Sequence, residues 1–184
     1  MSASASESPS RLTIRPSQPA DLPDITAIYD QAVAISSATF EIDPPDLAEM
    51  SRRRDEVLSK SLPWLVAEDG NQVLGYAYAA PFRARPGYRF CLEDSIYLHP
   101  DSRGRGLGRL LLGELVARCQ AVGGRQMLAV IGDSANAPSI GLHRALGFRD
   151  VGTLQSACWK FERWFDVVLM QRVLGAGDSA APGI

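Results

Sequence analysis

A glycine-rich segment, Arg103–Gly108, constrains the fold of this chain most, because it lies between a strand-like run and a helix-like run. The strand-like run is Ser95–Leu98, and apolar residues recur at helical spacing from Leu107 onward. Glycines let a backbone turn tightly and approach a ligand, while a helix N-terminus offers free N–H groups and partial positive charge. Three arginines add charges that can pair with phosphate oxygens: Arg103, Arg105 and Arg109. The segment therefore predicts a phosphate-bearing ligand. The alternative is that the segment is a glycine-rich turn that starts the helix and binds nothing.

Two common glycine-rich phosphate loops do not fit this segment. A P-loop requires Lys followed by Ser or Thr after its last glycine, whereas Gly108 is followed by Arg109. A dinucleotide fingerprint requires a third glycine where Arg109 or Leu111 stands. The spacing that does fit is Arg-x-x-Gly-x-Gly from Arg103, which resembles the acetyl-CoA pyrophosphate loop of the GNAT superfamily of N-acetyltransferases. The resemblance implies that the cosubstrate acetyl-CoA is bound by Arg103, Gly104, Arg105, Gly106, Leu107, Gly108 and Arg109.

A second motif follows the apolar run that ends at Ile131. It contains Asn136, Ser139, His143 and Gly147-Phe148, and is similar to the GNAT pattern of Asn, a small residue, usually Tyr, and then Gly-Phe. The resemblance implies that Asn136 and Ser139 contact the cofactor or fix its loop. It also implies that the pantetheine arm runs along the strand before the glycine-rich segment, at Ile96, Tyr97 and Leu98.

Four further segments resemble one subgroup, the phosphinothricin and methionine sulfoximine acetyltransferases. They are Thr39-Phe40-Glu41, Glu93–Leu98, Leu142–Phe148 and the pattern Lys160-Phe161-x-x-Trp164-x-Asp166-x-x-x-Met170. The resemblance covers roughly residues 12–172. It implies the acyl-CoA N-acyltransferase fold, in which a mixed, mostly antiparallel, twisted sheet is flanked by helices.

Hydrophobic spacing predicts secondary structure that agrees with this fold. Helical periodicity predicts a helix capped by Asp21 and further helices over 47–59, 107–122 and 137–146. Extended or alternating runs predict strands over 12–15, 64–68, 73–80, 90–98, 126–131, 151–160 and 165–173. A turn at Asp69-Gly70-Asn71 predicts a hairpin between the second and third strands. The order of elements indicates an α/β protein with a mixed sheet.

Length and composition limit the class of protein. The chain of 184 residues favours one domain, which we place at 11–174, with disordered tails at 1–10 and 175–184. A formal charge of −2 argues against a nucleic-acid partner, and no apolar run is long enough to span a membrane. The three cysteines form no metal-binding or disulfide pattern, so we expect a reduced cytoplasmic setting and no metal.

Acetyl transfer to an amine needs a base, because an ammonium has no lone pair with which to attack. Alternation along the strand puts Glu93, Ser95 and Tyr97 on one face, and a carboxylate at a partly apolar strand centre should have a raised pKa. Glu93 is the candidate base, a role that the resembling family also implies, and Asp94 is the second choice. The alternative for Glu93 is an ion pair with a neighbouring arginine. His143 is a candidate acid, or a second base paired with Glu93, unless it is a core residue.

The acceptor site is predicted from two segments. Arg83 and Arg85 lie two apart in an extended stretch bounded by prolines, and paired guanidinium groups suit a carboxylate, phosphinate or sulfoximine. Phe40 and Glu41 match the family's other substrate-facing segment, and Tyr88 is a further candidate. Arg83, Arg85, Phe40 and Glu41 each have the alternative of a solvated loop position.

The predicted activity is transfer of acetyl from acetyl-CoA to the α-amine of a small amino-acid analogue such as phosphinothricin, methionine sulfoximine or methionine sulfone. Another small amine or a peptide N-terminus is the alternative acceptor, and a non-catalytic CoA-binding module is the alternative class. A polyamine is disfavoured, because its site should be acidic whereas Arg83 and Arg85 are basic. The family resemblance also implies a homodimer.

Overall fold

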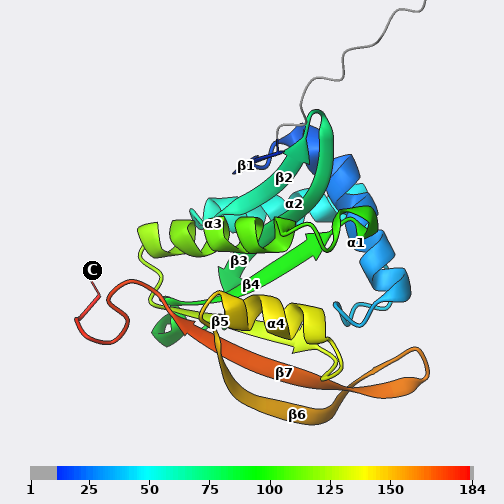
Figure 1. Cartoon of the computed structure of the whole chain (residues 1–184). Coiled ribbons are helices and arrows are strands. Elements are labelled where there is room, and N and C mark those ends of the chain that lie inside the picture. The colour runs from blue at the N-terminus through cyan, green and yellow to red at the C-terminus, as the bar shows by residue number, and fades with distance from the viewer. Residues whose placement is uncertain (1–11, 183–184) are drawn as a thin grey trace, which may run out of the picture.

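The computed structural model describes residues 12–182, in which seven strands form one twisted sheet (Figure 1). The strands are β1 (Leu12–Pro16), β2 (Trp64–Asp69), β3 (Gln72–Pro81), β4 (Cys91–Leu98), β5 (Gln126–Gly132), β6 (Arg149–Lys160) and β7 (Arg163–Val173). Their order is β1-β2-β3-β4-β5-β7-β6, and among these strands only β4 and β5 pair in parallel. The predicted α/β class with a mixed, mostly antiparallel sheet is confirmed.

Within residues 12–182, four α-helices cover the sheet on its two faces: α1 (Leu22–Ile35), α2 (Leu47–Ser59), α3 (Leu107–Ala121) and α4 (Ala137–Ala145). Helices α3 and α4 lie on one face, and α1 and α2 lie behind the sheet in Figure 1. Short 3-10 helices occur at Pro19–Asp21, Pro86–Tyr88 and Pro100–Ser102. Among residues 12–182, no helix has both the length and the apolar character needed to cross a membrane.

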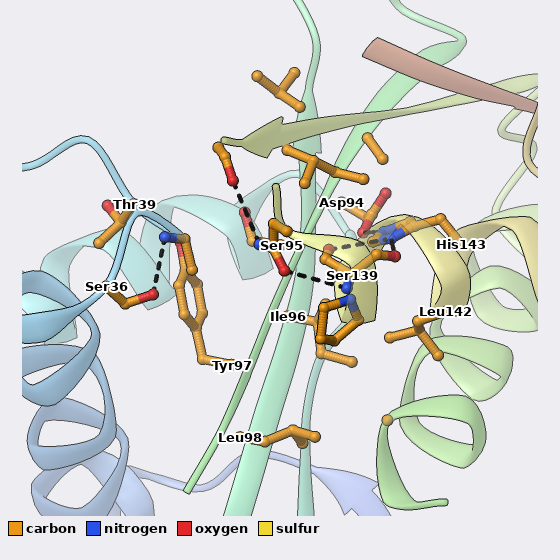
Figure 2. Close-up of a pocket in the computed structure, with 18 of the residues that line it drawn as sticks. Ser36, Thr39, Asp94, Ser95, Ile96, Tyr97, Leu98, Ser139, Leu142 and His143 are labelled. Carbon is orange, nitrogen blue, oxygen red and sulfur yellow. Dashed lines mark hydrogen bonds and ion pairs between the residues drawn. The ribbon is translucent and has the colours of Figure 1, made fainter. Parts of the chain in front are cut away.

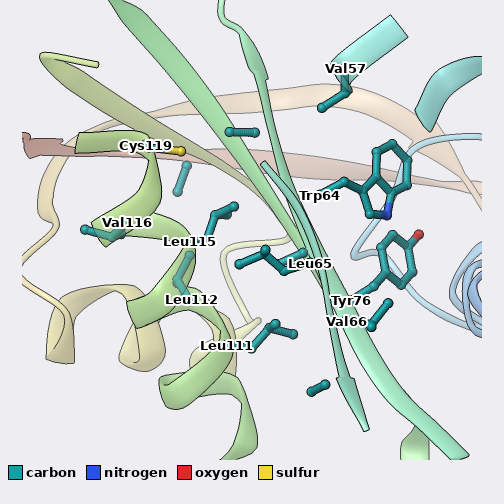
Figure 3. Packing of buried hydrophobic residues seen from close by; sticks show 14 of the residues in the cluster. Val57, Trp64, Leu65, Val66, Tyr76, Leu111, Leu112, Leu115, Val116 and Cys119 are labelled. Atoms are coloured by element: carbon teal, nitrogen blue, oxygen red, sulfur yellow. The ribbon is translucent and has the colours of Figure 1, made fainter. Parts of the chain in front are cut away.

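The core lies between α3 and the sheet and continues on the other face beneath α1 and α2. Figure 3 shows the apolar face of α3 directed at Leu65, with Trp64, Tyr76 and Val57 packed beyond the strands. Four α3 residues that pack there are fully buried: Leu111, Leu112, Leu115 and Cys119. Helical spacing also predicted Leu110 and Val122 on this apolar face, but their side chains are exposed. Burial of the four side chains fixes the direction of α3 and hence the position of its N-terminus over β4.

Strands β4 and β5 separate part-way along their length. Residues Cys91–Asp94 of β4 pair with residues Gln126–Ala129 of β5. Beyond this point β4 pairs only with β3, and β5 pairs only with β7. The backbone of residues 95–98 therefore has an edge with no strand beside it on the β5 side. This opening in the middle of the sheet positions the site.

The β6–β7 hairpin reaches far from the centre of the sheet (Figure 1). Strand β6 is an edge strand, and its residues are exposed over most of its length until Lys160, which is buried. After β7 the chain turns at residues 175–180, where the Gly177 N–H donates to the Leu174 carbonyl. The predicted tail at 1–10 lies outside the described residues.

Candidate active site

A cavity of about 560 Å³ opens where β4 and β5 separate (Figure 2). Its lining comes from the segments 36–40, 93–98, 103–109, 129–132 and 136–143. Glu93 and Asp94 both line it, although neighbouring residues of a strand point to opposite faces. The cavity therefore passes through the sheet and is accessible to groups from both helical layers.

The predicted alternation along β4 is confirmed by the contacts of its side chains. The Tyr97 ring meets the edge of Tyr29 of α1, with ring centroids 4.9 Å apart. Asp94 instead contacts His143 of α4, on the opposite face. Glu93 lies on the same face as Tyr97, the α1 side, whereas Asp94 lies on the α3 and α4 side.

Glu93 is a partly buried carboxylate without a direct partner. Within residues 12–182 the Glu93 side chain makes no hydrogen bond or ion pair. The alternative prediction, an ion pair between Glu93 and a neighbouring arginine, is therefore wrong. Burial raises the pKa of Glu93, the neighbouring Asp94 charge raises it further, and the Arg83 charge opposes the rise. A carboxyl with a raised pKa can hold and release a proton closer to neutral pH.

The partner of His143 is Asp94 and not Glu93, which corrects the predicted pairing. The His143 Nε2 is 3.0 Å from the Asp94 Oδ2, and its Nδ1 is 2.8 Å from the Ser139 carbonyl oxygen. Figure 2 shows these three residues together on one side of the pocket. The pairing with Glu93 fails because Glu93 and Asp94 point to opposite faces of β4, and α4 covers only the Asp94 face.

The surroundings of His143 favour its charged form, the imidazolium. The Ser139 carbonyl can only accept, so Nδ1 carries a proton, and Nε2 faces the carboxylate of Asp94, which favours a second proton on the ring; the residue is only 2% exposed. Burial works to lower the pKa of His143, but the hydrogen bond and charge of Asp94 and the bond to Ser139 outweigh it, so the pKa is raised. The Asp94 Oδ1 is buried and has no hydrogen-bond partner among the described residues.

The glycine-rich segment forms the other end of the pocket as a left-handed turn. Gly104 has φ 75° and Gly106, the N-cap of α3, has φ 78°, values that favour glycine. In the described part of the chain, the N–H groups of residues 104–108 donate no hydrogen bond. Arg103 and Arg109 line the cavity with Gly104, Gly106 and Gly108.

Comparison with known proteins gives the family. The sequence model of the Acetyltransferase (GNAT) family matches residues 25–148. The chain belongs to this family. It is an acetyl-CoA-dependent N-acetyltransferase, in agreement with both sequence motifs.

Relatives of this GNAT enzyme cover nearly all of it. A phosphinothricin N-acetyltransferase of Alcaligenes faecalis is 52% identical over 92% of the chain and 86% of that protein. An L-methionine sulfoximine/L-methionine sulfone acetyltransferase of Pseudomonas aeruginosa is 43% identical over 91% of the chain and 98% of that protein. The crystal structure of a GNAT phosphinothricin acetyltransferase from Sinorhizobium meliloti with acetyl-CoA superposes with a TM-score of 0.91 at 48% identity, covering 94% of this chain and 93% of that one.

The residues of this GNAT site fit acetyl-CoA. Unpaired N–H groups and the α3 N-terminus, with Arg103 and Arg109, suit the pyrophosphate. The open edge of residues 95–98 offers backbone groups to the amide-bearing arm. Asn136 caps α4 by accepting from the Ser139 N–H at 3.2 Å, and its Nδ2 donates to the Gly132 carbonyl at 3.3 Å, so it fixes the loop between β5 and α4.

Two predicted cofactor residues have a different placement from the rest. The Leu107 side chain is buried in the core, with 3% exposure, so only its backbone faces the turn. Arg105 is exposed and is not among the residues that line the cavity. Helical spacing already contained the signal for Leu107, because it is the first residue of the buried stripe of α3.

The predicted acceptor residues do not all reach the cavity. Phe40 lines it, whereas Glu41 pairs with Arg53 of α2 at 2.6 Å. Three others lie in the exposed segment between β3 and β4 and do not line the cavity: Arg83, Arg85 and Tyr88. Within that segment, the Arg83 guanidinium lies 4.9 Å from the centroid of the Phe82 ring. Spacing indicated that Arg83 and Arg85 could project to the same side, but it could not show how the segment packs.

Sequence reasoning missed the contacts that hold the segment 36–40. Thr39 lines the cavity, and its Oγ1 lies 2.8 Å from the hydroxyl of Tyr29. Lys160 donates to the Ser36 and Thr39 carbonyls at 3.0 and 2.9 Å. A usable signal was present, since Lys160 lies between two aromatic residues and is one of only two lysines in the chain.

Proposed function

We propose that this enzyme transfers acetyl to the α-amine of a small amino-acid analogue of the phosphinothricin, methionine sulfoximine or methionine sulfone type. The names of its relatives support this acceptor class, with 52% identity to one and 43% to another. The observation that carries the proposal is the place of Glu93 in the cavity, on the opposite face of the sheet from the His143 side. The acceptor would enter from the α1 side and meet the acetyl group at the gap between β4 and β5.

Glu93 is proposed as the general base. Bound acetyl-CoA supplies the acetyl thioester. Glu93 would take one proton from the acceptor ammonium, directly or through a water, which frees the lone pair for attack on the carbonyl carbon. The raised pKa of Glu93, caused first by burial, favours this transfer near neutral pH. Direct attack is supported by the positions of the cysteines, since Cys91, Cys119 and Cys158 are not among the residues that line the cavity.

His143 is proposed to position the site and not to act as the acid. Both of its ring nitrogens are engaged with Asp94 and Ser139, so neither N–H is free to protonate a departing thiolate. The pair instead ties α4 to β4 at the point where the strands begin to separate. His143 would therefore act on the site indirectly, by holding Asp94 in place.

Arg83 is proposed to attract the anionic group of the acceptor. Its charge lowers the pKa of Glu93, so its guanidinium acts on the electrostatics around the base. A guanidinium near the base suits an amino acid whose carboxylate or phosphinate lies a few bonds from the amine. Arg85 stays a prediction for the same anionic group, while Glu41 and Tyr88 stay predictions for the polar head of the acceptor and for the pocket lining.

The proposal is tested by release of free thiol from acetyl-CoA in the presence of each amine. We expect release with phosphinothricin, methionine sulfoximine or methionine sulfone, and much less with spermidine or a short peptide. No release above hydrolysis with any of the three would exclude the acceptor class. Glu93→Gln should lower turnover about 100-fold with nearly unchanged acetyl-CoA affinity. The control is Glu114→Gln, on an exposed ion pair of α3, which should change neither.

A homodimer is proposed as well. It is supported by large apolar side chains exposed on the β6–β7 hairpin, including Trp159 at 52% and Trp164 at 60% exposure. Edge strand β6 also presents unpaired backbone groups to a second copy of the chain. Sedimentation velocity of the whole chain at two concentrations should give twice the monomer mass, and a monomer at both would contradict the proposal.

A further inference from the structure

Lys160 is a buried cation with no acidic partner. It is 3% exposed, and among residues 12–182 no carboxylate lies within ion-pair distance of its ammonium. Its Nζ donates to the carbonyls of Ser36 at 3.0 Å and Thr39 at 2.9 Å, and it lies 4.8 Å from the centroid of the Phe161 ring. Burying an ammonium is costly unless its protons are satisfied, and here two backbone carbonyls and an aromatic face provide that.

The position of Lys160 is fixed by the tip of the β6–β7 hairpin. Lys160 and Arg163 are the last paired residues, and the two residues between them are left-handed, with φ 51° for Phe161 and 56° for Glu162. A two-residue turn with both φ values positive matches the twist of the flanking strands and defines their register. The turn therefore fixes the direction of the Lys160 side chain, which lies beside the segment 36–40 although the two are far apart in the sequence.

The segment 36–40 forms one wall of the cavity and is held from three sides. Thr39 is bonded to Tyr29 of α1, and Lys160 holds the Ser36 and Thr39 carbonyls. On the third side the segment lies directly against β5: a Cβ at Gly132 would come within 1.8 Å of the Ser37 carbonyl oxygen. Lys160 supplies the contact that joins this wall to the C-terminal hairpin.

We propose that Lys160 is a positioning residue that latches the segment 36–40 against β5 and so shapes the acceptor side of the pocket. Lys160 does not line the cavity and acts only through the two carbonyls. Its removal should therefore weaken acceptor binding and leave the cofactor end, 103–109, as it is. The term acceptor side rests on the proposed function, whereas the latch itself rests on the contacts alone.

The kinetic test compares Lys160→Met, Lys160→Arg and the wild type. Lys160→Met keeps a long apolar side chain and removes the donors, so KM for the amine should rise at least about tenfold, as when charge-assisted hydrogen bonds are lost. KM for acetyl-CoA should stay nearly unchanged, and Lys160→Arg should restore much of the amine KM. The matched control is Lys60→Met, which removes the chain's other lysine from an exposed ion pair with Glu56 and should change neither KM. An equal rise in both KM values for Lys160→Met would overturn the proposal.

Hydrogen–deuterium exchange without any substrate tests the latch independently of the acceptor. Lys160→Met should speed exchange of amides in peptides covering 36–40 and leave peptides covering α3 unchanged. Unchanged exchange at 36–40, or faster exchange across the whole chain, would contradict a local latch. If the wild type acetylates none of the proposed amines, the proposed function fails, while the exchange result still decides whether Lys160 holds this segment.

Discussion

His143 and Asp94 form an ion pair whose contribution to the stability of the fold depends on pH. The pKa of His143 is raised in the folded protein, because Asp94 and Ser139 outweigh the effect of burial. A histidine of this kind stabilises the fold fully below its unfolded pKa of about 6.5, and the contribution is lost as pH rises through the folded pKa. The pair should therefore stabilise the protein most in mildly acidic solution.

Asp94→Asn should lower the free energy of unfolding by about 3 kcal/mol near pH 6, because it leaves a buried imidazolium without its counter-charge. The loss should be smaller near pH 9, because the contribution of the charged pair declines as pH rises through the raised pKa of His143. Urea unfolding at the two pH values measures both. Asp101→Asn is the matched control, since Asp101 faces His99 at 3.8 Å but is exposed, and it should have little effect. An equal loss at both pH values would show that His143 is not charged.

The sequence predicted Glu93 and His143 as site residues, but it could not pair His143 with its partner. Alternation along β4 correctly separated Glu93 from Asp94, because side-chain direction in a strand is a local property. Which face meets His143 depends on the face that α4 covers, and that is set by packing between segments 49 residues apart. The contact between Lys160 and Thr39 is harder still to predict, because these residues are 121 positions apart in the sequence.

At the scale of elements, the helices and most strands follow from hydrophobic periodicity, but the gap between β4 and β5 does not. The observed bounds differ from the predicted ones by a few residues, and the β2–β3 hairpin turns at Gly70, inside the predicted turn. The gap depends on which backbone edges pair, and side-chain patterns do not encode where a pairing stops. The cavity could therefore be predicted by family resemblance and not by periodicity.

Gly132, at the end of β5, should not tolerate even a methyl group. Its Cβ would overlap the Ser37 carbonyl oxygen and lie 3.0 Å from the Phe40 ring, so Gly132→Ala must displace the segment 36–40. We expect kcat/KM for the amine to fall at least about tenfold, since misplacing a pocket wall by an ångström can cost more than that. Gly141→Ala is the control: a Cβ there meets nothing within 4 Å, and alanine favours the α4 helix, so activity should be kept. Wild-type kinetics for Gly132→Ala would show that the wall is not rigid.

At the scale of the whole molecule, acetyl-CoA should stabilise the fold, because the pocket that would hold it is lined by elements from both halves of the sheet. The pocket joins β4 and the start of α3 with β5 and α4. A ligand that binds only the folded chain, present at about 100 times its Kd, adds about 2.7 kcal/mol of stability. For a chain of this size the rise in Tm should be about 5–10 °C.

Two glycines separate the role of the cofactor loop from backbone strain. Gly106 and Gly70 both have left-handed φ values, 78° and 63°, and a Cβ at either meets nothing within 4 Å. Alanine at either position should therefore cost about 1 kcal/mol of stability through strain alone. Only Gly106 lies in the pocket, so Gly106→Ala should also reduce the rise in Tm caused by acetyl-CoA, whereas Gly70→Ala should keep the full rise. Thermal unfolding with and without acetyl-CoA measures both effects, and an undiminished rise for Gly106→Ala would mean that the cofactor does not depend on the backbone of this turn.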